Sequence, residues 1–231
     1  MPRKQRVLLV SEAHYLNSGF GTYAKEILKR LHATGKYELA ELAAYGKSSA
    51  VNDTDWLFYG NAPEDGDPQE QIDAYNSQPV NQFGAWRFDR VCLDFKPDIV
   101  LCYRDPWMDM FIKDSPTRPY FHWVWMPTVD SAPQRQEWIN GFAECDALMA
   151  YSEFGEQVLK EQGKENVNVI GCASPGIDPS VYLPIPNKGE HKKAFGLDPS
   201  CFIVGTVMRN QRRKLFFELM RGFRLFLDKA P

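Results

Sequence analysis

The sequence has no long hydrophobic run and few cysteines. No stretch of about 18 apolar residues is present, and no apolar segment of the signal-peptide kind follows the basic start at residues 1–6. The five cysteines lie far apart, without a CxxC pair or a histidine cluster. We therefore expect reduced core thiols, no metal site and a cytoplasmic location.

A strong charge of either sign is also missing, because the formal net charge is only −3. Residues 208–231 nevertheless hold seven cations and two anions, a net +5, so the remaining residues carry −8. A cationic end on an acidic body predicts a local anion site and no nucleic-acid partner. The basic start (Arg3, Lys4 and Arg6) leaves peripheral contact with anionic lipid open, although a solvated terminus is the more ordinary explanation.

What is present is typical of a soluble globular protein: 44% hydrophobic and 25% charged residues. The length of 231 residues exceeds one average domain and is short for two. Strand patterns at residues 6–13 and 37–45 flank a helical pattern that ends at Gly35. Residues 51–82 are polar and rich in turn residues, which predicts a surface excursion with one short strand at 56–60.

From Phe83 onward, helices and strands alternate again. The pattern predicts helices at 85–95, 134–145 and 153–163, and strands at 98–103, 119–126, 147–152 and 167–173. Strands alternating with helices of this length require parallel crossovers. The expected fold is therefore an α/β protein with a Rossmann-like, doubly wound parallel sheet, whose ligand binds at the carboxyl ends of the strands.

The last third has a different character. We expect a first domain at residues 1–180, a Pro- and Lys-rich connector at 181–199, and the start of a second domain at 200–231. Residues 201–208 predict a strand and 212–228 a helix that is apolar on several sides. Without neighbours for these elements, we expect exposed apolar surface and self-association.

Arg209 and Lys214 lie where this strand pattern gives way to the helix. A strand end that leads into a helix start presents backbone N–H groups and a positive dipole, which favour phosphate. A guanidinium and an ammonium added there predict a diphosphate site. A solvated helix start explains the same spacing equally well.

Three motifs together resemble the group 1 (family 4) glycosyltransferases of the GT-B fold. They are "SGFGTYAKEIL" near the amino end, "YSEFGEQVLKEQG" ahead of "SPGIDPSVYLPI", and "VMRNQRRK" after a strand. The resemblance implies two Rossmann-like domains that face each other across a cleft. It also implies a retaining transfer of a sugar from a nucleotide-diphosphate sugar to an acceptor such as a glycan or a lipid-linked sugar, without a metal or cofactor.

The resemblance assigns roles to several residues. Arg209 and Lys214 would bind the donor diphosphate, and the loop with Gly19 and Gly21 would approach the donor phosphate or the acceptor. Gly176 and Asp178 match a Gly-x-Asp turn at the cleft. The family commonly has histidine before that glycine and this chain has Pro175, which leaves the histidine's role without a residue.

Family members continue through most of a second domain, including two glutamates that contact the donor. The resemblance therefore implies that this sequence is a fragment or truncated frame that lacks most of its carboxyl-terminal domain. We expect little or no transfer by this chain alone.

Two other functions fit some of the same residues. Gly19, Gly21 and Ala24 satisfy G-x-G-x-x-A, which would indicate an NAD-dependent oxidoreductase, but Gly19 lies nine residues beyond Val10 rather than in the turn directly after the strand. A non-catalytic glycan-binding module is the other alternative. Its supporting feature is the 13% aromatic content, including Trp107, Trp123, Trp125 and Trp138, which burial explains equally well.

Two catalytic candidates follow from the strand pattern at 119–126. Asp130 lies just past the expected carboxyl end, where it would accept a hydrogen bond from a sugar hydroxyl, or serve as a turn or capping residue. His122 is also a candidate, although alternation favours a core histidine midway along the strand. Arg104 and Asp105, at another strand end, would pair with each other or border the cleft, and Ser152 would cap a helix.

Overall fold

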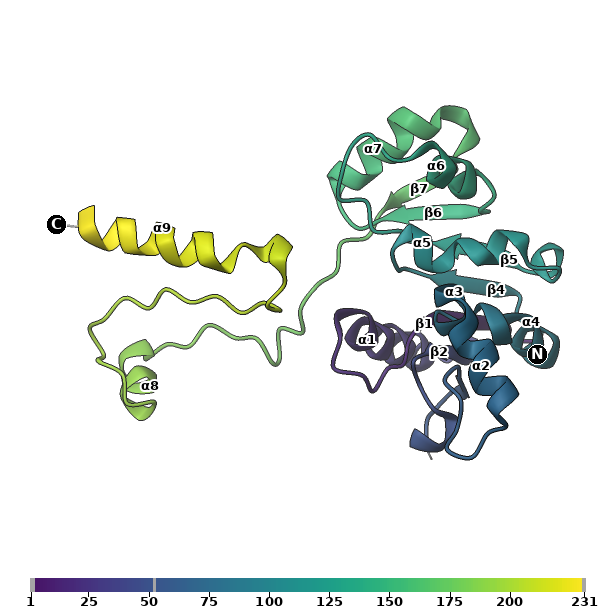
Figure 1. Ribbon diagram of the computed structural model, residues 1–231, viewed down its shortest axis with the longest axis horizontal. Coiled ribbons are helices and arrows are strands. Elements are labelled where there is room, and N and C mark those ends of the chain that lie inside the picture. Colours follow the sequence, from purple (N-terminus) through teal and green to yellow (C-terminus); the bar gives the residue numbers. More distant parts are fainter. Residues whose placement is uncertain (1–2, 52, 230–231) are drawn as a thin grey trace. The chain divides into compact units, whose positions relative to one another are not determined.

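The computed structural model describes residues 3–51 and 53–229, and these form two compact units, with the boundary in the sequence between Gly176 and Ile177. The first unit is built on one seven-stranded sheet with the order β3-β2-β1-β4-β5-β6-β7, in which every neighbouring pair is parallel. The strands are β1 (Gln5–Glu12), β2 (Tyr37–Ala44), β3 (Leu57–Gly60), β4 (Ile99–Cys102), β5 (His122–Trp125), β6 (Ala147–Ala150) and β7 (Val169–Cys172). The expected α/β class with a Rossmann-like doubly wound sheet is confirmed (Figure 1).

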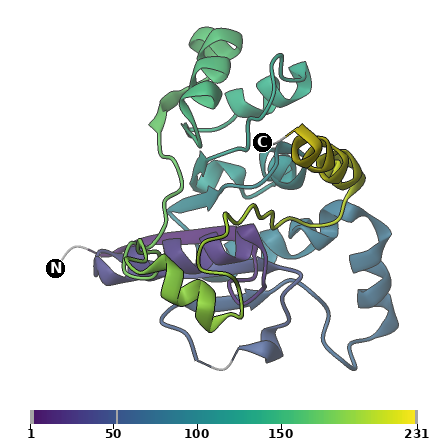
Figure 2. The same ribbon diagram turned by 90° about the vertical axis from the view of Figure 1, so that its left-hand side faces the viewer.

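The helices of this unit connect the strands. They are α1 (Gly19–Ala33), α2 (Gln69–Ser77), α3 (Pro79–Gln82), α4 (Ala85–Phe95), α5 (Pro106–Asp109), α6 (Gln136–Ala143) and α7 (Glu153–Gly163), with 3₁₀ turns η1 (Ser48–Ala50), η2 (Met110–Asp114), η3 (Arg118–Tyr120) and η4 (Lys164–Asn166). Figure 2 shows the same elements from the side. The described helices do not include one with the length and apolar character that a bilayer crossing requires.

Each face of the sheet has its own hydrophobic core. The larger core joins α4, α6 and α7 to one face, with Trp123, Trp125 and Phe142 fully buried at its centre. The smaller core joins α1 to the other face through Ala24, Leu28 and partners on β1 and β2. The two faces use alternate residues of the same strands, as a sheet with helices on both sides requires.

Local sequence signals set the helix ends. Ser18 caps α1 by accepting a hydrogen bond from the Gly21 amide at 3.0 Å, and Ser152 caps α7 in the same way through Gly155 at 3.1 Å, as expected for Ser152. Gly35, with φ of +66°, follows the end of α1. Helix α4 ends at Phe95, just before Pro97, which cannot continue a helix.

The excursion at 51–82 contributes more structure than the composition indicates. Its short strand was expected and becomes β3, which pairs with β2 at the edge of the sheet.

The thiols differ from expectation: Cys92, Cys102 and Cys145 are buried, whereas Cys172 is exposed and Cys201 is half-buried. Cys172 is exposed because it lies on β7, the last strand of the sheet.

The second unit contains α8 (Lys188–Ala194), the 3₁₀ turn η5 (Arg212–Lys214) and α9 (Phe216–Lys229). The expected helix is present, but the strand expected at 201–208 is not, and that prediction was wrong. A strand needs a hydrogen-bonded neighbour, and no described segment pairs with these residues. Helix α9 has no buried residue, which agrees with the expected exposed apolar surface.

Candidate functional site

Because all seven strands are parallel, the loops after β1, β4, β5 and β6 meet at one edge of the first unit. The strand order reverses between β1 and β4, since β2 and β3 extend to one side and β5 to β7 to the other. The crevice outside such a reversal is where doubly wound proteins bind ligands. The candidate site is therefore the carboxyl edge around β1 and β4.

The junction between β1 and α1 is closely packed at this edge. A Cβ atom on Gly21 would lie 2.7 Å from the carbonyl oxygens of Ala13 and Leu16, so only glycine fits there. A Cβ atom on Gly19 would meet nothing within 4 Å. The side chain of Ser18 also donates a hydrogen bond to Glu12, which closes the loop over its own helix start.

Both glycines lie inside α1, not in a turn directly after β1, which ends at Glu12. The Gly21 amide is already bonded to Ser18, so the first-turn amides that remain for a ligand are those of Gly19 and Phe20. In the described part of the chain, no group of three or more metal-ligating side chains gathers.

A histidine that the motif analysis passed over lies in this loop. His14 follows β1, and its Nδ1 is 2.7 Å from Oε2 of Glu41. The His14 amide donates to the other carboxylate oxygen at 2.8 Å, and the indole of Trp56 donates to Oε2 at 3.0 Å. Glu41 is completely buried, while the His14 side chain keeps 13% of its surface exposed.

This arrangement fixes the histidine. Because an ionised carboxylate can only accept hydrogen bonds, the contact with Glu41 assigns the proton to Nδ1 of His14, and Nε2 is then the ring's acceptor atom. The rings of Tyr15, Trp56 and Phe58 each pack edge-on against the imidazole, with His14–Trp56 centroids 5.2 Å apart. The buried carboxylate of Glu41 therefore has hydrogen-bond partners on both oxygens, and these hydrogen bonds hold the His14 ring in one orientation.

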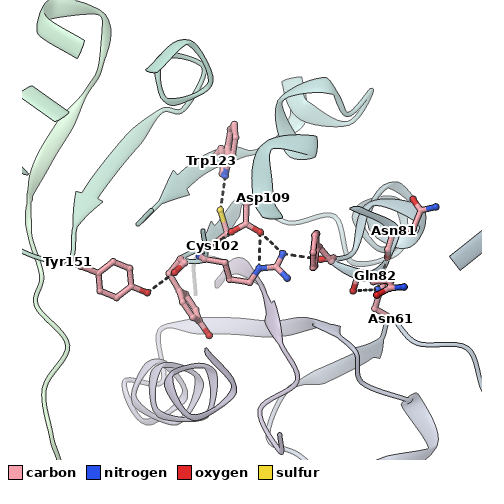
Figure 3. A network of polar contacts seen from close by, with 10 residues as sticks. Asn61, Asn81, Gln82, Cys102, Asp109, Trp123 and Tyr151 are labelled. Carbon is pink, nitrogen blue, oxygen red and sulfur yellow. Dashed lines mark hydrogen bonds and ion pairs between the residues drawn. The ribbon is translucent and has the colours of Figure 1, made fainter. Parts of the chain in front are cut away.

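Tyrosines connect the start of α1 to the end of β4. The hydroxyl of Tyr103 donates to the Phe20 carbonyl at 3.0 Å. The Tyr151 hydroxyl donates to the Tyr103 carbonyl at 2.6 Å, as Figure 3 shows. Tyr23 packs edge-on against Tyr103, with ring centroids 4.8 Å apart. Burial raises the pKa of all three phenols, so they remain hydrogen-bond donors at neutral pH.

The loop after β4 contains a buried ion pair, also drawn in Figure 3. Arg104 and Asp109 are both 0% exposed, and Nε of Arg104 donates to Asp109 Oδ1 at 2.9 Å. Of the two alternatives for Arg104 and Asp105, their mutual pairing is wrong, because the turn of α5 brings Asp109, its last residue, back onto the guanidinium. Asp105 instead accepts a hydrogen bond from the Thr128 hydroxyl, which links the loops after β4 and β5.

The two catalytic candidates do not lie together. Asp130 is exposed in the loop after β5, at the carboxyl edge. His122 is the first residue of β5 and lies at the opposite, amino edge, with 76% of its side chain exposed. The expectation of a core histidine midway along a strand was wrong, because η3 occupies Arg118–Tyr120 and delays the start of the strand.

An open cavity lies at that amino edge. It measures about 490 Å³ and is lined by His122 together with two pairs, Arg3–Asp98 and Arg118–Asp146, at 2.6 and 2.8 Å. Although burial acts in the other direction, hydrogen bonds from the Trp123 amide and Arg118 lower the pKa of Asp146. Each arginine is neutralised by its own carboxylate, and the cavity lies away from the strand ends where ligands of this fold bind. The carboxyl edge is therefore the better candidate.

The remaining expected site residues lie at or beyond the unit boundary. Gly176 ends the first unit, and a Cβ atom added to it would meet nothing within 4 Å. Asp178 is the second residue of the second unit and lies in a turn where its Oδ1 accepts from the Ser180 amide at 2.9 Å. In the second unit Arg209 is exposed in an irregular segment, and Lys214 is half-buried at the end of η5. These four residues thus provide no geometry for a site by themselves.

Comparisons with known proteins show similarity in structure and none in sequence. No family model matches the chain, and no curated protein matches it in sequence. Sucrose-phosphate synthase from Thermosynechococcus elongatus aligns with 96% of this chain at a TM-score of 0.69 and 14% identity, and this chain spans 60% of that protein's length. A UDP-GlcNAc 2-epimerase from Methanocaldococcus jannaschii aligns with 73% of this chain and 45% of its own length, at a TM-score of 0.43 and 15% identity.

The likeness is one of fold. The first unit shares the architecture of the amino-terminal domain of GT-B enzymes, as the sequence analysis expected. At 14% identity the alignment carries no activity with it.

Proposed function

We propose that the protein forms the acceptor-side domain, and the start of the donor-side domain, of a retaining glycosyltransferase. The enzyme moves a sugar from a nucleotide-diphosphate sugar to an acceptor such as a glycan or a lipid-linked sugar. The observation that supports this most directly is the fold likeness to sucrose-phosphate synthase over 96% of the chain. The ordered motifs at Gly19, Gly176 and Arg209 support it independently.

In this proposal the donor diphosphate is bound mainly by Arg209 and Lys214. Charge develops on the diphosphate as the glycosidic bond to the sugar breaks, and fixed cations stabilise that charge without a metal. A hydrogen bond to a charged group contributes about 1.5–3 kcal/mol.

The acceptor side uses two residues of the carboxyl edge. Asp130 accepts a hydrogen bond from a sugar hydroxyl. Nε2 of His14, whose ring is held by Glu41, contacts the acceptor hydroxyl. His122 receives no part in the transfer, because its strand places it at the other edge.

Calorimetry with UDP and GDP on the full-length product of the gene tests the donor assignment. Arg209→Ala and Lys214→Ala should each weaken nucleotide binding about ten- to a hundred-fold. The matched control is Arg224→Ala, which removes the same charge from α9, where Arg224 pairs with Asp228 at 2.9 Å. Unchanged affinity in both test variants, or an equal loss in the control, would contradict the proposed diphosphate site.

A further inference from the structure

A second open groove lies on the flank of the first unit, between α6 and the segment formed by α5 and η2 (these elements are labelled in Figure 1, apart from η2). It measures about 460 Å³. Its walls are formed by two tryptophans and four polar side chains: Trp107, Trp138, Lys113, Glu137, Asn140 and Glu144. The two tryptophans belong to the four that the sequence analysis named, and the other two, Trp123 and Trp125, are fully buried in the core.

The position of Trp107 is set before any ligand binds. Its ring packs edge-on against Phe83, with centroids 5.1 Å apart, while 53% of the residue stays exposed. Trp138 packs partly on the larger core and is flanked on one side by Arg135, whose guanidinium lies 5.2 Å from the ring centroid. The groove thus has one open aromatic surface and one fixed aromatic wall.

The floor of the groove depends on a close approach of two elements. A Cβ atom on Gly141 would lie 2.1 Å from the sulfur of Met110, so glycine lets α6 lie directly against η2. From Glu137 to Glu144 the groove follows α6 for about 10 Å at 1.5 Å per residue. An extended ligand fits this length better than a compact one.

The polar side chains retain hydrogen-bonding capacity. Oδ1 of Asn140 accepts from Gln136 at 2.9 Å, which leaves its NH₂ group as a donor. Lys113 pairs with Asp114 at 2.8 Å, and Glu137 lies 3.7 Å from Arg135 at the exposed rim. Donors and acceptors on both walls of the groove, together with an exposed indole, match a molecule with an apolar ring face and a rim of hydroxyls.

We propose that this groove binds a neutral oligosaccharide. The C–H face of a pyranose ring stacks on Trp107, and its hydroxyls exchange hydrogen bonds with Asn140, Glu144 and Lys113. The groove carries two carboxylates, Glu137 and Glu144, and one ammonium, Lys113, so its net negative charge disfavours anionic sugars such as uronic or sulfated ones. The binding needs no nucleotide and no transfer chemistry, so it stands or falls separately from the proposed transferase.

The test is a titration of the full chain with maltohexaose, cellohexaose and chitohexaose, without nucleotide, followed by two-dimensional ¹H–¹⁵N NMR of the indole groups. The chain has six tryptophans. At least one of the three probes should shift the Trp107 and Trp138 signals saturably, with a Kd of about 1 mM or tighter. The buried Trp123 and Trp125 serve as internal references.

Variants then separate the groove from non-specific binding. Trp107→Ala and Asn140→Ala should each lower the affinity about three- to ten-fold. Phe154→Ala removes an aromatic side chain of similar exposure, 48%, from α7 outside the groove and should leave the affinity unchanged. Trp107→Ala removes an exposed ring, so the fold should survive, and the unperturbed Trp123 and Trp125 signals verify it.

The proposal is overturned if none of the three probes shifts the Trp107 and Trp138 signals. It is also overturned if Trp107→Ala binds as tightly as the parent chain, or if Phe154→Ala loses as much affinity as Trp107→Ala. Equal binding of trigalacturonic acid would overturn the preference for neutral sugars.

Discussion

Replacing Asp109 by asparagine should destabilise the first unit strongly. Asp109 and Arg104 have no exposed surface, and the carboxylate accepts hydrogen bonds from the Arg104 side chain and, at 3.2 Å, from its amide. The guanidinium also donates to the Phe83 carbonyl at 2.9 Å, which ties this loop to the segment before α4. Asparagine keeps the size of the side chain but leaves a buried cation without a counter-charge.

The expected loss is about 3–5 kcal/mol, the usual cost of breaking a buried pair by removing one partner. A domain is stable by only about 5–15 kcal/mol, so this is a large part of the total. Removing both charges is different: Arg104→Met with Asp109→Leu replaces the pair by apolar groups of similar size. That double variant should lie far closer to the parent chain than Asp109→Asn does.

Urea unfolding followed by tryptophan fluorescence measures the difference, since Trp123 and Trp125 lie in the adjacent core. The control is Asp65→Asn, because Asp65 pairs with Lys47 at 2.6 Å but is 98% exposed, and it should cost less than about 1 kcal/mol. If Asp109→Asn costs no more than the Asp65 control, the reasoning is refuted. If Asp109→Asn does not fold, the double variant Arg104→Met with Asp109→Leu decides the matter. Its failure to fold would also refute the reasoning.

Three further predictions concern the rest of the first unit. Gly21→Ala should destabilise the fold by about 1–3 kcal/mol, because its Cβ would meet two carbonyl oxygens at 2.7 Å, whereas Gly19→Ala should be neutral or slightly stabilising in thermal unfolding. The pKa of Asp98 is lowered, first by the hydrogen bond from the Arg6 amide and then by the neighbouring arginines. The ionised carboxylate therefore stabilises the fold at pH values above the unfolded-state pKa of about 4. This stabilisation is lost as the pH falls through the folded-state pKa. At neutral pH, the Asp98→Asn variant should therefore unfold at a lower urea concentration than the parent chain, whereas near pH 2 the two midpoints should coincide. The same difference in midpoint at both pH values would contradict the predicted pH dependence. Glu41→Gln should release the histidine that it orients, seen in NMR as the loss of a slowly exchanging Nδ1 proton, and persistence of that signal would show that the carboxylate does not hold the ring.

The sheet could be predicted from the sequence because each of its strands and helices has a pattern that is visible within a short stretch of residues. Each buried strand is an apolar run, and each helix repeats its apolar residues at the period that one face requires. Elements whose existence depends on a distant partner were harder to predict. Residues 201–208 have a strand composition but no described neighbour to pair with, and His122 follows a 3₁₀ turn that alternation alone does not reveal.

The His14–Glu41 pair was missed for the same reason, since 27 residues separate its members. A signal was nevertheless present. Glu41 stands inside the apolar strand pattern "YELAELAAY", and a carboxylate in a buried strand requires partners. Searching for the polar residue that satisfies it would have directed attention to the loop after β1.

The contacts around this loop fix the proposed site at the carboxyl edge before any ligand is present. The loop between β1 and α1 is bound to β2 through Glu41 and to β1 through Glu12, and the start of α1 is bound through the Phe20 carbonyl to Tyr103, which follows β4. Movement of the α1 start relative to the sheet would therefore break several hydrogen bonds at once. Ordering a flexible side chain or loop on binding costs about 0.5–1.5 kcal/mol for each side chain immobilised, and here folding has already met that cost. A ligand at this edge therefore meets His14 and the first amides of α1 in fixed positions.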